Sequence, residues 1–186
     1  MTTKERLAVI AKIAKDDSNI GKTGMMKLLY LLQTVYGLPL GYDFQIYTYG
    51  PYCQTVMSDI EYAEFIGYIQ VLPVTYSGGM SGYQISTKTE GGEAIKNASG
   101  RLSEYTAALE DVIHKFGKRS AKELELYSTI VFVTRSFVEN EWEKSKEEVC
   151  SVVQRIKPHF QFDTIQKAYD ELEDMCFLDT KGIQVQ

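Results

Sequence analysis

Positive charge is missing from a long stretch of this 186-residue chain, because no lysine or arginine occurs between residues 28 and 87. Proteins that bind nucleic acid need clustered cationic side chains that neutralise phosphates. The same stretch carries acidic residues instead, at Asp43, Asp59, Glu61 and Glu64. The formal net charge of the whole chain is −5. These features argue against a general nucleic-acid-binding protein and against a protein that binds anionic membranes.

Cysteine and histidine are also scarce. Cys53, Cys150 and Cys176 are far apart and form no CxxC pair, so neither a zinc site nor a disulfide framework is expected. His114 and His159 lie in different segments, and neither is close in sequence to a cysteine. No serine lies in a G-x-S-x-G nucleophile motif. We therefore expect no catalytic residues, no metal and no cofactor, and we do not expect an enzyme.

Long apolar runs are absent as well. No run of 18 apolar residues occurs, so no transmembrane helix and no membrane partner are expected. Residues 1–17 alternate lysine with apolar residues at helical spacing and lack the continuous apolar stretch of a signal peptide. The sequence therefore predicts a cytoplasmic protein. Its length suffices for one domain with a full core or for two small domains.

The first half of the chain has a recognisable order of elements. Apolar spacing predicts a helix over residues 4–15 and a second over 23–36. The second is apolar on nearly every side, so we expect it to form the buried centre. A strand over 44–49, a helix after Pro51 and a hairpin of strands 69–76 and 82–86 follow. Helix, strand, helix and hairpin is the order of a winged helix. The expected fold is therefore mainly α with a small antiparallel β-hairpin, built on a winged-helix-like N-terminal core.

The second half of the chain reads as helical. Residues 87–100 contain three glycines among mostly polar neighbours and are the best candidate for a junction. A capping box at Ser120 and Glu123 predicts the start of a helix, and a more polar helix with Trp142 is expected over 139–156. We predict a core over residues 1–90 and a helical C-terminal half over 101–186 packed on it. A single domain remains the alternative.

Tyrosine is concentrated in the first half, where ten of the thirteen tyrosines lie between residues 30 and 83. Tyrosines bury a large area with little loss of rotamer entropy, which suits protein interfaces. Pro51 restricts the residue before it, so the strand should end and a helix should start there, with Tyr49 and Tyr52 close together. Tyr47 should share the face of Tyr49. We predict that Tyr47, Tyr49, Pro51 and Tyr52 form a partly exposed corner that binds a protein partner. A purely structural hinge is the alternative.

DNA binding is the second function that the sequence leaves open. The first 27 residues contain six cations and three acidic residues, Glu5, Asp16 and Asp17, which leaves a local excess of three positive charges. A winged-helix transcription regulator would have to use the second helix, with Lys22 and Lys27 as its DNA-binding residues. Because the helix before the hairpin is acidic and the hairpin is neutral, DNA is a weaker candidate than a protein partner. A homodimer also remains open.

Several short motifs occur together in this chain. They are Lys27-Leu28-Leu29-Tyr30-Leu31, Phe44, Tyr49-Gly50-Pro51-Tyr52, Gly67-Tyr68-Ile69, Glu123 to Ile130, and Ile156-Lys157-Pro158-His159-Phe160 followed by Ile165 and Ala168. This set resembles the YwgA-like and Panacea (SocA-like antitoxin) group. The chain departs from the group's pattern at Gly24 and Met26, where polar or basic residues are more usual.

The resemblance implies a winged-helix-like core with helical additions and no assigned chemistry. Panacea-type members act as antitoxins that bind a toxin protein, and the best-known kind also serves as a proteolysis adaptor. The resemblance therefore implies a non-enzymatic regulatory protein-interaction module, antitoxin-like or adaptor-like in its role. This expectation agrees with the lack of positive charge over residues 28–87.

Overall fold

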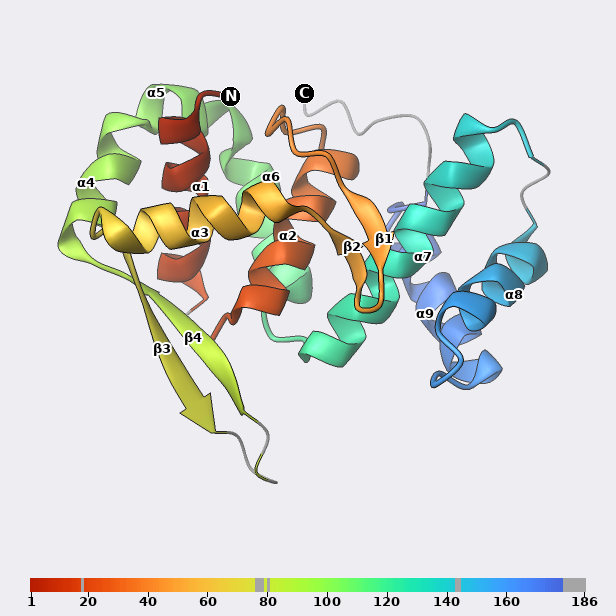
Figure 1. The fold of residues 1–186 in the computed structure, drawn as a ribbon. Helices are drawn as coiled ribbons and strands as arrows, with labels where there is room; N and C mark the ends of the chain where they lie inside the picture. The colour runs from red at the N-terminus through yellow and green to blue at the C-terminus, as the bar shows by residue number, and fades with distance from the viewer. Residues whose placement is uncertain (18, 76–78, 80, 143–144, 179–186) are drawn as a thin grey trace.

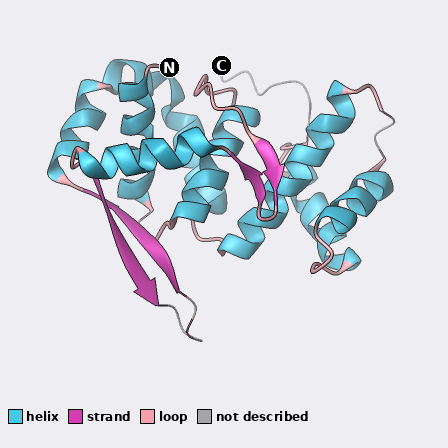
Figure 2. Cartoon of the chain, in the orientation of Figure 1, coloured by secondary structure: helices cyan, strands magenta, loops and turns pink. Residues whose placement is uncertain are grey.

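The computed structural model describes residues 1–17, 19–75, 79, 81–142 and 145–178. The fold is mainly helical and contains two antiparallel two-stranded sheets (Figures 1 and 2), which confirms the expected mainly-α class. The helices are α1 (Thr3–Asp16), α2 (Lys22–Thr34), α3 (Gln54–Phe65), α4 (Thr89–Asn97), α5 (Ser99–Leu102), the 3-10 helix η1 (Ser103–Tyr105), α6 (Thr106–Phe116), α7 (Ala121–Glu139), α8 (Lys146–Ile156) and α9 (Phe162–Asp174). The strands are β1 (Gln45–Tyr47), β2 (Gly50–Tyr52), β3 (Ile69–Thr75) and β4 (Ser81–Thr87).

Helix α2 lies at the centre of the protein. Its apolar residues leave no wide polar face, so the helix must pack against other elements on several sides to bury them. It contacts α3, α6 and α7, and Leu28, Leu29 and Leu32 are fully buried as predicted. One hydrophobic cluster contains α2 together with residues from both halves of the chain, as far as Leu178. Packing is therefore continuous across the boundary predicted between residues 90 and 101.

The two sheets lie apart. Strands β3 and β4 pair from Ile69 with Thr87 to Thr75 with Ser81, which confirms the predicted hairpin, although residues 76–78 and 80 of its tip lie outside the described residues. The hairpin projects from the helical body in Figure 1. Its base is attached through the Ile85 amide, which donates to the Ile20 carbonyl at 2.8 Å. Among the described strands, β1 pairs only with β2. The predicted order of elements is present, but the first strand is not part of the β3–β4 sheet.

The predicted junction over residues 87–100 is not an extended linker, because helix α4 occupies most of it and packs on α1. The glycines of this segment suggested a junction, but Gly91 has a role in packing. A Cβ built on Gly91 would lie 2.1 Å from the Tyr68 carbonyl oxygen. Gly91 therefore allows a close approach of α4 to the chain before β3, and it does not mark a linker.

The single helix predicted over residues 139–156 is wrong. Helix α7 runs on to Glu139 and ends there, and α8 begins only at Lys146 after Ser145, whose side chain accepts a hydrogen bond from the Glu148 amide. Trp142 lies between the two helices, where its ring packs edge-on against Phe137 with centroids 5.5 Å apart. Within the described residues, no helix is both long and apolar enough to cross a membrane.

Candidate functional site

The predicted tyrosine corner is a β-hairpin, not a strand that leads directly into a helix. Strands β1 and β2 pair Gln45 with Tyr52 and Tyr47 with Gly50, so the chain reverses direction at Thr48 and Tyr49. The prediction that a helix starts at Pro51 is therefore wrong: Pro51 lies in β2, and α3 begins at Gln54. This position tolerates a proline, because both strands of a two-stranded sheet are edge strands.

The four predicted partner-binding residues differ in exposure. Tyr47 and Tyr49 are 63% and 69% exposed at the end of the hairpin, whereas Pro51 is buried and Tyr52 is half-buried. The ring of Tyr52 packs on Tyr47 with centroids 5.6 Å apart, and its hydroxyl donates to Gln54 Oε1. The side chains brought together are thus Tyr47 and Tyr52, whereas we expected Tyr49 and Tyr52. Tyr49 occupies the turn itself.

Gly50 places the hairpin directly on helix α7. Its φ of +86° lies in the left-handed region, which a residue with a Cβ rarely adopts. A Cβ at this position would also lie 2.9 Å from Thr129 Oγ1 and 3.3 Å from the Glu125 carbonyl oxygen. Glycine is therefore required here for two reasons, backbone conformation and close contact, and the hairpin rests on the middle of α7 (Figure 1).

Two buried lysines hold the hairpin. Lys27 of α2 is 2% exposed, and its ammonium donates to the Pro51 carbonyl at 2.6 Å. Lys157, 1% exposed and directly after α8, donates to the carbonyl of Thr48 and lies 3.3 Å from that of Tyr47. Hydrogen bonds from charged donors are stronger than those between neutral groups. These contacts therefore fix the hairpin backbone beside the exposed Tyr47 and Tyr49.

A single buried carboxylate accompanies these two cations. Glu125 Oε1 of α7 lies 2.8 Å from the Lys157 ammonium and 3.6 Å from Nε2 of the half-exposed His159. Burial lowers the pKa of Lys27 to about 8; the positive charge of Lys157 acts in the same direction and Glu125 opposes it. The site is therefore an ionic cluster at the junction of α2, α7, α8 and the hairpin, with more positive than negative charge.

The Lys27 ammonium gives this cluster a measurable pH dependence. In the folded protein Lys27 releases its proton near pH 8, whereas in the unfolded chain it holds the proton up to about 10.5. The unfolded state then binds more protons between these values, so stability rises with pH. We expect the free energy of unfolding of the wild type to gain up to about 3 kcal/mol over this window relative to the Lys27→Met protein. Urea titrations of both proteins at several pH values in this window measure the difference in their free energies of unfolding. Tyrosines titrate in both proteins, so their contribution cancels in this difference. Equal slopes for the two proteins would contradict the assignment.

Of the two residues predicted for DNA binding, Lys27 is engaged inside the protein and Lys22 lies partly exposed against the β3–β4 hairpin. Lys27 is buried beneath Pro51 and does not face solvent. The Lys22 ammonium lies 4.5 Å from the centroid of the Tyr83 ring. Of the other N-terminal cations, Arg6 pairs with the buried Asp59, with Nε and Oδ2 2.8 Å apart. Two of the six N-terminal cations, Lys27 and Arg6, are therefore engaged by buried or mostly buried acceptors, whereas Lys4 and Lys15 are exposed.

Sequence reasoning missed Glu125, Lys157 and His159 as members of the site. One signal was available for Glu125, because a lone acid on the buried side of an apolar helix needs a buried cation as partner. Nothing local could identify Lys157, whose contacts with the hairpin span 109 and 110 residues of sequence. Within the described part of the chain, no three histidine, cysteine, aspartate or glutamate side chains gather closely enough to hold a metal ion.

A scan against protein-family models and a search of curated proteins found no match to this chain. The site presents two exposed tyrosines on a short hairpin whose backbone is anchored by buried charges.

Proposed function

We propose that the protein is a non-enzymatic regulatory protein-interaction module that acts in the cytoplasm and binds a protein partner through the tyrosine hairpin. The observation that carries the proposal is the exposure of Tyr47 and Tyr49 on a backbone fixed by Lys27 and Lys157. An antitoxin-like or proteolysis-adaptor role is the form of this function that the resemblance to the YwgA-like and Panacea group implies. Such a partner would be a toxin or another regulatory protein.

The hairpin has the properties of a preorganised binding element. Tyrosine side chains at interfaces contribute large contact areas, and anchors held rigid before binding lose less entropy when the complex forms. The carbonyls of Tyr47, Thr48 and Pro51 are bound to ammonium groups from two separate helical segments. A simple chain reversal needs no exposed pair of aromatic side chains. The arrangement therefore supports a role of the hairpin in recognition.

DNA binding by a winged-helix regulator is the second candidate, and the order of α1, α2, β1, α3 and the β3–β4 hairpin is the observation that favours it. We rank it lower because α3 exposes Glu61 and Glu64, and because no lysine or arginine occurs in α3, β3 or β4. Of its two proposed contacts, Lys27 is buried. Phosphate contacts need accessible donors, preferably cationic, and α3, β3 and β4 supply no lysine or arginine for them.

The Tyr47→Ala/Tyr49→Ala protein is expected to fold normally and to lose its partner. Both side chains are largely exposed, so their removal should cost little stability, whereas truncation of two interface anchors should weaken binding by about 30-fold or more. The partner is to be identified by affinity purification from the native cells, and the reconstituted complex measured by isothermal titration calorimetry. Tyr62→Ala is the matched control, since Tyr62 is 50% exposed on α3. If the double variant binds the partner as tightly as the wild type, the hairpin is not the interface.

Fluorescence anisotropy with random-sequence duplex DNA at low salt tests the second candidate. We expect no submicromolar binding. Submicromolar affinity with a steep dependence on salt concentration would instead indicate that several phosphates are neutralised, and would promote the DNA-binding function over the one proposed.

A further inference from the structure

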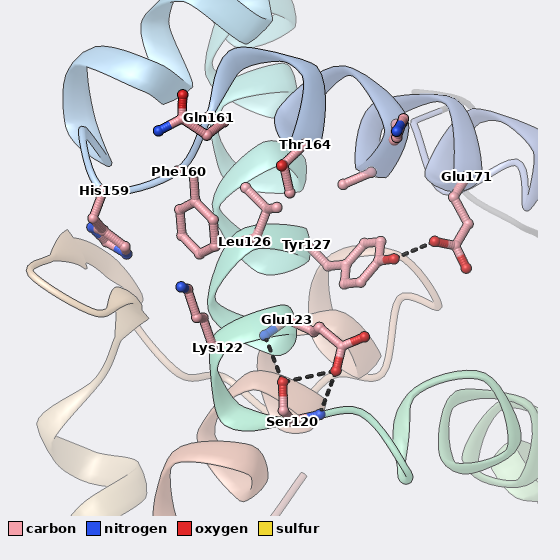
Figure 3. A pocket seen from close by; sticks show the side chains of 12 residues that line it. Ser120, Lys122, Glu123, Leu126, Tyr127, His159, Phe160, Gln161, Thr164 and Glu171 are labelled. Atoms are coloured by element: carbon pink, nitrogen blue, oxygen red, sulfur yellow. Dashed lines mark hydrogen bonds between the residues drawn. The ribbon is translucent and has the colours of Figure 1, made fainter.

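A groove opens between the first turns of α7 and helix α9, and we call it the α7–α9 groove (Figure 3). Its cavity volume is about 380 Å³. The floor is apolar and consists of Leu126 and Tyr127 of α7, Phe160 before α9, and Ala168 of α9. A volume of this size lies at the lower end of the range for ligand sites and suits one or two large side chains.

The rim of the groove carries two carboxylates and two lysines that differ in whether they form ion pairs. The two rim carboxylates, Glu123 and Glu171, both pair with Arg119, and Glu171 also accepts a hydrogen bond from the Tyr127 hydroxyl. Lys122 and Lys167, on opposite walls, form no ion pair within the described residues.

Arg119 does not line the groove, but it pairs with both rim carboxylates, so Lys122 and Lys167 remain available for a ligand. The Lys122 ammonium lies over the ring of Phe160, 5.4 Å from its centroid, so this positive charge stands at the edge of the apolar floor. In a chain with a net charge of −5, a groove with unpaired cations beside an apolar floor is locally distinct. Its chemistry complements a group that combines an apolar side chain with negative charge.

The groove is connected to the tyrosine hairpin through a short series of contacts. His159 lies at one end of the groove, with Nε2 3.6 Å from Glu125 Oε1. The same oxygen pairs with Lys157, whose ammonium donates to the Thr48 carbonyl of the hairpin. The exposed His159 therefore lies between the groove and the buried ionic cluster that holds the hairpin.

We propose that the α7–α9 groove binds a peptide segment of the protein partner in which an apolar side chain is flanked by carboxylates. The apolar side chain occupies the floor formed by Leu126 and Phe160, and the carboxylates pair with Lys122 and Lys167. This assignment rests on the proposed function, because it names the chemistry of the partner that the hairpin recruits.

The test uses the full chain and fluorescein-labelled synthetic peptides with a central Leu-Phe pair flanked by glutamates. One comparison peptide has lysines in place of the glutamates, and another has serines in place of Leu-Phe. Fluorescence anisotropy should show saturable binding of the acidic apolar peptide and at least tenfold weaker binding of both comparison peptides. Amide resonances that shift on titration should lie in α7 and α9.

Two variants locate the binding in the groove. Lys122→Glu/Lys167→Glu reverses the unpaired charges, and Thr164→Trp places a large ring on an exposed position of the α9 wall. Each should weaken peptide binding at least tenfold. Lys88→Glu/Lys96→Glu is the matched control, because it makes the same change of charge at exposed positions beside and on α4 and should bind within twofold of the wild type. Circular dichroism of each variant verifies that the fold is kept.

The proposal is overturned if no peptide binds at millimolar concentration, if the lysine-flanked peptide binds equally well, or if the groove variants bind like the wild type. These failures are distinct from failure of the hairpin. If Tyr47→Ala/Tyr49→Ala loses the natural partner while Lys122→Glu/Lys167→Glu keeps it, the hairpin remains the interface and the groove is not part of it.

Discussion

The Glu125→Gln protein is expected to lose about 3–5 kcal/mol of stability, because the change removes one partner of a buried ion pair. Glutamine has nearly the same shape as glutamate, so the loss reports charge and not packing. Without the carboxylate, the ammonium of Lys157 loses its ion-pair partner at 2.8 Å, and Lys27 loses its nearby compensating charge. Lys157 then remains buried without its counter-ion, which is costly in a medium of low polarity, and the pKa of Lys27 is lowered further. Chemical denaturation monitored by circular dichroism measures the change.

Two further proteins make the Glu125→Gln result specific. Glu110→Gln, at an exposed position of α6, removes the same charge and should change stability by less than about 0.5 kcal/mol. In the Glu125→Gln/Lys157→Met protein both partners are replaced, so the loss should be clearly smaller than the sum of the two single losses. Strict additivity of the two single changes would show that Glu125 and Lys157 are not energetically coupled.

The Leu29→Ala protein should lose about 2–5 kcal/mol of stability. Leu29 is fully buried in α2, and α2 is packed against α3, α6 and α7. When a site is enclosed by several helices it cannot easily collapse around the missing atoms, so the lost contacts and the remaining cavity both contribute to the cost. The loss should appear in equilibrium unfolding by urea as a lower midpoint with an unchanged slope.

Leu72→Ala provides the matched control for Leu29→Ala. It deletes the same atoms from an exposed position on β3 and should cost less than about 1 kcal/mol, since little apolar area is lost from the interior. A loss of less than about 0.5 kcal/mol for Leu29→Ala would show that α2 is peripheral, contrary to its position in the hydrophobic cluster.

The charges counted in a sequence can differ from the charge that the folded surface presents, and Lys27 illustrates why. Lys27 contributes to the positive excess of the first 27 residues, yet in the folded chain it binds a backbone carbonyl 24 residues away. Arg6 similarly binds Asp59, and both partners lie mostly out of solvent. A cation that satisfies a buried acceptor is unavailable to phosphate, so the tertiary contacts weaken the DNA-binding interpretation more than composition alone does.

The sequence by itself determined the elements whose signals are local. Apolar residues at helical spacing identified α1 and α2, and the Ser120–Glu123 capping box identified the start of α7, because these interactions join residues three or four positions apart. The β3–β4 hairpin also follows from short-range pattern, since alternating segments are joined by glycine-rich turn residues.

Only the tertiary structure decided what depends on distant partners. The pairing of β1 with β2 relies on Gly50 fitting against Thr129, and the ammonium that fixes the turn comes from Lys157, more than 100 residues further along the chain. The α7–α9 groove likewise exists only where two helices and the segment at His159 meet. Such contacts are set by how the packed core closes, a property of the whole chain that no local spacing encodes.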